Sequence, residues 1–322
     1  MFKQLDQRIF NWVSEKKPWT NVYGMTRSII ALSTLVTLLF NDVSTFFKPV
    51  AGFSEYPACS VYPVSIFCFF PKDYMYLTIA KYIAIVLLAI VASGWRPRIT
   101  GVLHWWIASS IQNTAVTLDG GEQVAVAMTF LLLPVTLLDN RKWHWQEYNA
   151  DDDNRVHAKL ISVLFLFAIK IQLSIIYFHA AIAKIVNPEW VDGTAFYYYI
   201  QDPMLGTNPI LLKIIWPLIS SPFVVFITWG TIILELLLGA AIFAQRRFQR
   251  TMMYFGFGLH ISIAILMGLY SFSAIMCASL LLALRPTENH INMYWIEKTK
   301  EAILVKIRTL KKYNKLTSSP KY

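Results

Sequence analysis

The chain has 322 residues, of which 56% are hydrophobic and only 15% are charged, and its mean hydropathy is +0.47. A soluble protein carries about a quarter charged residues, so this composition excludes an ordinary soluble domain and indicates a surface that faces lipid. The net charge of +10 does not indicate nucleic-acid binding, because the basic residues lie in short segments between apolar runs, as membrane proteins place them.

Eight apolar segments follow one another along the chain, each close to the roughly 20 residues that a helix needs to cross a bilayer. We therefore predict an all-α, polytopic transmembrane bundle in residues 1–286. Polar residues in the third segment indicate that it faces protein, and Gly268 predicts a tight turn between the last two. Residues 287–322 predict a basic amphipathic helix on the cytoplasmic leaflet, with a solvated basic tail as the alternative. The predicted spans are 24–41, 74–93, 99–118, 122–138, 159–185, 222–244, 251–268 and 270–286.

The distribution of Lys and Arg predicts the orientation, because cytoplasmic loops are enriched in positive charge. The N-terminal segment is basic, and so is every second loop: 94–98, 139–158 and 245–250. The loops between them are poorer in positive charge. This alternation predicts eight crossings with both termini in the cytoplasm.

Cysteine is scarce, and its spacing shows no Cys/His metal-binding pattern, so no metal site is predicted. Cys277 lies in an apolar run and is expected to be an inert core residue. Cys59 and Cys68 share one loop on the extracytoplasmic side. That oxidising environment permits a disulfide between them.

Three ionisable residues lie deep within predicted spans: Lys170, Glu235 and His260. Counting about 1.5 Å per helical residue places them at similar depths. An unpaired charge at such depth is costly, so we predict a Lys170–Glu235 pair that includes His260. This buried polar cluster has two interpretations. It either fixes the register of the helices, or it serves as a proton path or substrate anchor.

A second polar set lies toward the extracytoplasmic ends of the spans. Tyr177 and Lys184 fall on one stripe of the fifth span, because positions seven apart nearly eclipse on a helix, whereas His179 points elsewhere. A lysine near the end of a span commonly does no more than extend its ammonium to the headgroups. The remaining members of the set are Lys81, Gln112 and Asn113.

The sequence around Lys184 carries a recognisable pattern. Residues 177–184, YFHAAIAK, are followed by EWVDG at 189–193, which resembles the core motif of the vitamin K-dependent γ-carboxylases in the HTTM superfamily. The resemblance implies that Lys184 is an active-site base at the outer membrane face. A second element that resembles this superfamily is Gln112–Asn113 followed by DGGE at 119–122, and Arg27 and His260 are weaker matches. The carboxylases continue into a large lumenal domain after the spans, so neither their reaction nor their quinone cofactor is carried over.

A closer resemblance, over nearly the whole chain, is to the sporulation-delaying protein B family. It rests on PWTNVYG at 18–24, YPAC at 56–59, SGWRPR at 93–98 and DGGEQ at 119–123. The resemblance implies a multi-pass protein of the bacterial plasma membrane. It also implies a role in maturing and secreting a peptide toxin or antimicrobial precursor, together with a small membrane-associated (SdpA-like) partner.

Three hypotheses follow, and the sequence leaves open whether the chain is an enzyme and which cofactor it uses. In the first, Lys184 is the base or nucleophile of a peptide-maturation reaction. The second is a non-catalytic export or chaperone scaffold, and the third a quinone- or lipid-using enzyme. Direct proteolysis by this chain is less favoured because no HExxH or GxSxG motif is present. The candidate catalytic residues are Lys184, Tyr177, His179, Asp192 and Glu189, and the candidate substrate-binding residues are Trp190, Gln112, Asn113 and Lys81.

Overall fold

The computed structural model describes residues 2–50, 56–148, 155–286 and 291, and within these residues the chain is helical with no β-strand. The all-α prediction is confirmed. The predicted amphipathic tail falls, except for Ile291, outside the described residues. The elements are α1 (Phe2–Ser14), α2 (Asn21–Phe40), α3 (Val43–Phe46), η1 (Ile66–Cys68), α4 (Tyr74–Ser93), α5 (Pro97–Thr114), α6 (Gly120–Leu137), α7 (Val156–Ile185), α8 (Pro188–Val191), α9 (Ala195–Tyr199), α10 (Pro209–Ile219), α11 (Phe223–Ala241), α12 (Arg246–Met267) and α13 (Tyr270–Leu284).

Each predicted span corresponds to a helix: α2, α4, α5, α6, α7, α11, α12 and α13. Six of them are long and apolar enough to cross a membrane, whereas α5 is more polar and α13 has only 15 residues. Gly268, with a φ of +69°, ends α12 just before α13 begins, so the predicted turn is present. The exact number of crossings stays a prediction.

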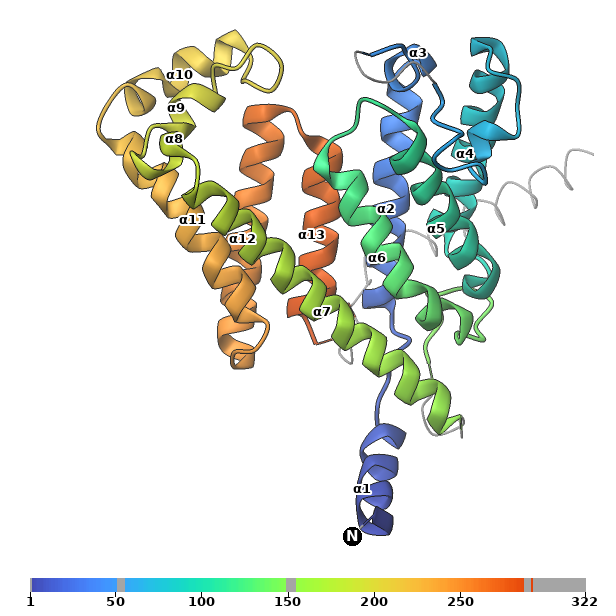
Figure 1. Ribbon diagram of the computed structural model, residues 1–322. Helices are drawn as coiled ribbons and strands as arrows, with labels where there is room; N and C mark the ends of the chain where they lie inside the picture. The colour runs from blue at the N-terminus through green and yellow to red at the C-terminus, as the bar shows by residue number, and fades with distance from the viewer. Residues whose placement is uncertain (1, 51–55, 149–154, 287–290, 292–322) are drawn as a thin grey trace, which may run out of the picture. The chain divides into compact units, whose positions relative to one another are not determined.

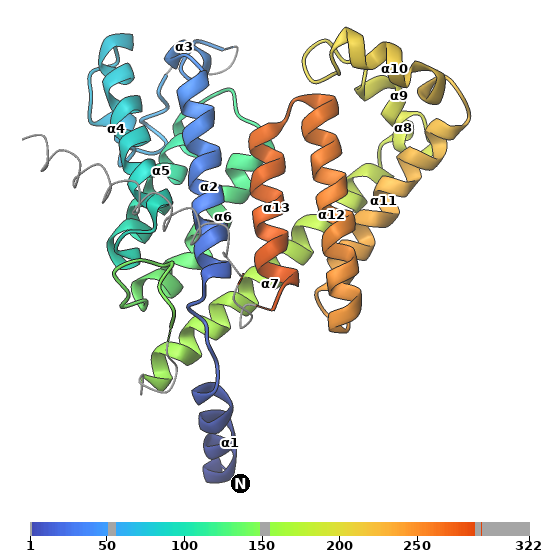
Figure 2. The same cartoon turned by 180° about the vertical axis from the view of Figure 1, so that it is seen from behind.

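The helices pack around two apolar cores that share α2. One core is formed by α2, α6, α7 and α11–α13, and the other by α2–α5 with η1. Figure 2 shows α2, α13 and α12 side by side, and α7 runs at a slant across the helices that it contacts (Figure 1). Small residues permit close packing in lipid: a Cβ on Gly101 would lie 2.1 Å from the Thr136 hydroxyl oxygen, so α5 and α6 can approach only with glycine there.

The loops predicted to be cytoplasmic lie at one end of this bundle. Trp95 and Trp143, from two different basic loops, form a β-bridge, and the Trp19 indole donates a 2.9 Å hydrogen bond to the Val135 carbonyl. This clustering agrees with the alternation of charge along the sequence. Which end faces the cytoplasm stays a prediction.

The opposite end of the bundle joins α6 to α13 and carries the disulfide. The Ser271 hydroxyl donates a 2.7 Å hydrogen bond to the Asp119 carboxylate, whose other oxygen caps the first turn of α6. Cys59 and Cys68 form the disulfide, with their Cα atoms 5.6 Å apart. The Ser271–Asp119 bond joins α6 to α13, which are distant in sequence, at the ends opposite the basic loops, called the outer ends below, whereas the disulfide closes a short loop.

Candidate functional site

Helices α7 and α11 run antiparallel and contact each other at Ser174 and Gly239. The Ser174 hydroxyl donates a 2.8 Å hydrogen bond to the Gly239 carbonyl, and the Phe178 ring lies against Gly239, where a Cβ would come within 3.2 Å of it. This contact fixes the register of the two helices. Residues after Ser174 on α7 therefore face residues before Gly239 on α11.

An ion pair joins the outer end of α7 to the middle of α11. The Lys184 side chain extends back toward the N-terminus of its helix, as helical side chains do, and its Nζ lies 2.9 Å from both Glu235 carboxylate oxygens. The side chains are 21% and 11% exposed, respectively. The Trp190 ring of α8 stands 5.2 Å from the same ammonium. We call Lys184–Glu235 the outer ion pair. Two charge-assisted hydrogen bonds and a cation–π contact therefore surround Nζ of Lys184.

The predicted Lys170–Glu235 pair is wrong. The Glu235 carboxylate binds Lys184 instead, and Lys170 precedes Ser174 on α7, so in this antiparallel register it faces residues after Gly239 and not Glu235. The prediction counted the depth of each residue from the end of its own helix and assumed that both helices end at the same depth in the membrane. However, α7 has 30 residues, runs at a slant, and meets Glu235 only near its outer end.

His260, the third member of the predicted cluster, pairs with Tyr177 instead. The Tyr177 hydroxyl lies 2.8 Å from His260 Nε2, both side chains are almost fully buried, and the imidazole packs edge-on against the Phe272 ring at 5.6 Å. Within the described part of the chain, His260 Nδ1 has no hydrogen-bond partner. The structure thus replaces the predicted cluster with two separate pairs that connect α7 to α11 and to α12.

The segment that follows Lys184 brings Trp190 onto the ion pair. Gly193 has a φ of +85°, and a Cβ there would lie 2.9 Å from Val225, so the turn between α8 and α9 can pack on α11 only with glycine. Asp192 accepts hydrogen bonds from the Thr194 amide at 2.9 Å and from its hydroxyl at 2.6 Å, and these bonds lower the pKa of the carboxyl group. Asp192 and Gly193 therefore shape the turn rather than contact the ammonium.

The other predicted site residues lie away from the outer ion pair. His179 and Glu189 are exposed. Lys81 donates a 3.1 Å hydrogen bond to the Asn41 carbonyl, and Asn113 donates one of 2.8 Å to the Ser109 carbonyl of its own helix. With Gln112, these residues belong to α4 and α5, which pack against α2, η1 and α6 on the side of the bundle opposite α8–α11 (Figure 1).

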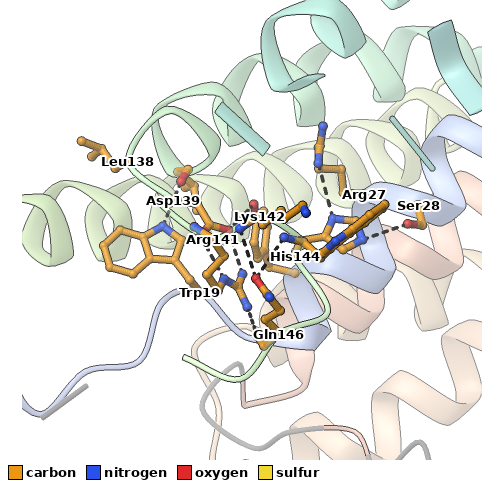
Figure 3. Close-up of polar contacts among 12 residues, drawn as sticks. Trp19, Arg27, Ser28, Leu138, Asp139, Arg141, Lys142, His144 and Gln146 are labelled. Carbon is orange, nitrogen blue, oxygen red and sulfur yellow. Dashed lines mark hydrogen bonds and ion pairs between the residues drawn. The ribbon is translucent and has the colours of Figure 1, made fainter. Parts of the chain in front are cut away.

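A buried arginine at the opposite end of the bundle was only a weak match in the sequence. Arg27 is 1% exposed, and its guanidinium contacts the Thr100 hydroxyl. It also lies 3.4 Å from His144 Nδ1, and Figure 3 shows Arg27 and His144 together with Ser28. Because arginine can only donate, Nδ1 accepts and the ring hydrogen lies on Nε2, 3.2 Å from Ser28 Oγ. The Ser28 hydroxyl in turn donates to the Ala92 carbonyl at 2.6 Å. We call Arg27, Ser28, Thr100 and His144 the Arg27 cluster.

The Arg27 cluster keeps its imidazole neutral. Burial, followed by the nearby guanidinium of Arg27, lowers the pKa of His144 to about 2. The adjacent carboxylate, Asp139, is already bound: Arg141 Nη2 lies 2.7 Å from it, and the Tyr23 hydroxyl donates to it at 3.0 Å. A basic residue inside a predicted span, together with the WHW sequence at 143–145, is the signal that could have identified this cluster.

Glu122 is a further buried acid, close to the outer end of α6. It is 1% exposed, and the Thr34 hydroxyl donates a 3.1 Å hydrogen bond to Oε2. Oε1 has no hydrogen-bond partner among the described residues. The DGGE motif identified this position, and the packing explains its second glycine, because a Cβ on Gly121 would lie 2.7 Å from the Phe272 Cα of α13.

Comparison with known proteins gives two close relatives over nearly the whole chain. It is 44% identical to the uncharacterized protein YitO of Bacillus subtilis (strain 168) over 298 residues, which span 92% of this chain and 96% of YitO. It is 40% identical to the sporulation-delaying protein SdpB of the same organism over 297 residues, 92% of this chain and 90% of SdpB. No protein-family model and no solved structure matches the sequence, so kinship with the γ-carboxylases stays a prediction. The extent and identity of these two matches show that the chain belongs to the SdpB family of multi-pass membrane proteins.

Proposed function

We propose that this chain is a membrane factor of a sporulation-delay system, which matures a secreted peptide precursor at the extracytoplasmic end of its bundle. The similarity to SdpB over nine-tenths of both chains supports the pathway. The outer ion pair carries the proposal for the site, because it places a partly exposed ammonium beside an aromatic ring near the predicted outer surface. A peptide precursor and a small membrane-associated partner are the proposed binding partners.

The geometry favours a binding and polarising role for Lys184 over that of a free base. An ammonium held by both oxygens of Glu235 carries no lone pair, so it cannot accept a proton or attack a carbonyl. It can donate a hydrogen bond to a peptide carbonyl or carboxylate that enters beside Trp190, and such donors stabilise developing negative charge. Lys184 becomes a base only if its proton first passes to Glu235, which leaves a neutral amine and a neutral acid.

A non-catalytic scaffold is the second candidate, and one observation favours it. His179, Glu189 and Asp192, which a catalytic site would use, do not converge on Lys184. The outer ion pair would then only fasten α7 to α11 while the bundle holds or exports the peptide.

The deciding experiment is complementation of cells that make the sporulation-delay precursor but lack their own SdpB. These cells would receive the wild-type chain, Lys184→Met, Lys184→Arg or, as a control on the exposed face of the same helix, His179→Ala. Mass spectrometry would quantify mature peptide outside the cells and precursor inside them, and an immunoblot would quantify the chain.

The three forms of the proposal predict different outcomes. A binding and polarising role predicts that precursor accumulates with Lys184→Met and that Lys184→Arg restores a substantial part of maturation, because arginine keeps the charge and the donors. A base or nucleophile predicts that both substitutions fail equally. Mature peptide at the wild-type yield from Lys184→Met, at a normal protein level, would rule out both and leave the scaffold.

A further inference from the structure

We propose that a pocket between the start of α12 and the end of α13 binds the phosphate of an anionic phospholipid. The cavity has a volume of about 240 Å³. Three guanidinium groups line it, those of Arg246 and Arg250 from α12 and that of Arg285 from the end of α13. Apolar and aromatic side chains, chiefly Met253, Tyr254 and Leu284, form the rest of its wall.

The two arginines that α12 contributes to the pocket form no ion pair within the described part of the chain. Arg246 is the first residue of α12 and Arg250 follows one turn later, where the helix dipole already presents positive charge. The first turn of α12 contains no acidic residue, and none lines the pocket among the described residues. Arg246 donates a 3.3 Å hydrogen bond to a neutral group, the Gln249 amide oxygen. A phosphate would supply a counter-charge for Arg246 and Arg250, with oxygens that match the guanidinium fork.

The surroundings of the pocket favour a lipid over a free anion. Arg246 and Arg250 lie at the start of α12, which is long and apolar enough to span a membrane, in one of the basic loops predicted to face the cytoplasmic leaflet, where anionic headgroups concentrate. Tyr254 is 63% exposed one turn further along α12, as expected for a tyrosine at a headgroup interface. Met253 and Leu284 provide an apolar wall against which the glycerol and the start of an acyl chain can lie. A free phosphate would gain nothing from that wall.

Native mass spectrometry of the full chain, titrated with phosphatidylglycerol or phosphatidylcholine in detergent, tests the proposal. The informative variants are Arg250→Gln and the double variant Arg246→Gln/Arg250→Gln. Arg247→Gln is the matched control, because it removes the same charge from the same helical turn but does not line the pocket. Circular dichroism would show that each variant retains its helices, and inorganic phosphate would be added as a competitor.

The expected result is preferential binding of phosphatidylglycerol that depends on the pocket arginines. Affinity should fall roughly five-fold for the single variant and roughly thirty-fold for the double variant, following the contribution of each basic residue near an anionic surface. Arg247→Gln should bind like the wild type. Equal weakening by Arg247→Gln would indicate non-specific charge attraction, and unchanged binding by the double variant would exclude the site. Inorganic phosphate that binds as tightly as the lipid would assign the pocket to a free anion, and each of these three results overturns the proposal.

Discussion

Removing one charge from the outer ion pair is the most direct test of the site's structure. Glu235→Gln keeps the shape of the side chain but leaves Lys184 as a half-buried ammonium with no carboxylate. Breaking a fully buried pair costs about 3–5 kcal/mol. Because Lys184 and Glu235 are 21% and 11% exposed, solvent screens part of this loss, and we expect about 2–3 kcal/mol.

The assay is thermal unfolding followed by circular dichroism in lipid nanodiscs. For a chain of this size the expected loss lowers Tm by about 4 °C. Lys184→Met should have a similar effect, because it leaves Glu235 unpaired. The double variant Lys184→Met/Glu235→Leu should lose far less than the sum of the two single variants, with a coupling energy of about 2 kcal/mol. His179→Ala, on the exposed face of α7, should change stability by less than about 0.5 kcal/mol. Additive single and double variants would show that Lys184 and Glu235 do not interact in the membrane.

Three further predictions concern other parts of the chain. The pKa of His144 is about 2 in the folded chain and about 6.5 when unfolded, so its contribution to stability is complete only well above pH 6.5 and is lost as pH falls toward 2. Between pH 6.5 and 5.5 the wild type should lose about 1 kcal/mol more than His144→Gln, measured by unfolding at both pH values. Maleimide should label neither Cys59 nor Cys68 before reduction and both after it, and labelling without reductant would contradict the disulfide. Replacing both cysteines by serine should lower the free energy of unfolding by about 3 kcal/mol for a loop of this length. Gly94→Ala should destabilise the chain by more than about 2 kcal/mol, because Gly94 has a φ of +86° and a Cβ there would lie 2.4 Å from the His144 ring. In contrast, a Cβ on Gly258 would meet nothing within 4 Å, so Gly258→Ala should stabilise its helix by about 0.5–1 kcal/mol. Equal unfolding temperatures for the two variants would refute the packing described around Gly94.

The spans could be predicted because each depends on local composition. An apolar run of about 20 residues forms a helix in lipid whatever it contacts, since every backbone group must be satisfied within the segment. The same reasoning predicted that the polar segment containing His104 faces protein, and His104 is 2% exposed in α5. Gly268 predicted a turn for an equally local reason, because glycine readily adopts a positive φ.

The pairs between helices could not be predicted from the same information. Depth counted along each helix ignores slant and offset, which is why Lys170 was matched to Glu235 in place of Lys184. The Arg27 cluster depends on a contact between residues 117 positions apart, Arg27 and His144. No periodicity within either segment encodes that distance.

The contacts of the 177–193 motif change which hypothesis its residues support. Tyr177 forms a hydrogen bond with His260, Asp192 accepts one from the Thr194 hydroxyl, and Gly193 lets the turn pack on α11. These three residues therefore have structural roles that would persist without any reaction. Lys184 differs from them, because its charge is partly exposed and its partner, Glu235, comes from another helix. A lysine that merely extended to the headgroups would need no such partner. Any chemistry at this end of the bundle therefore depends on whether an incoming peptide can replace Glu235 at the ammonium, and Lys184→Arg tests this exchange because it keeps the charge while abolishing a base.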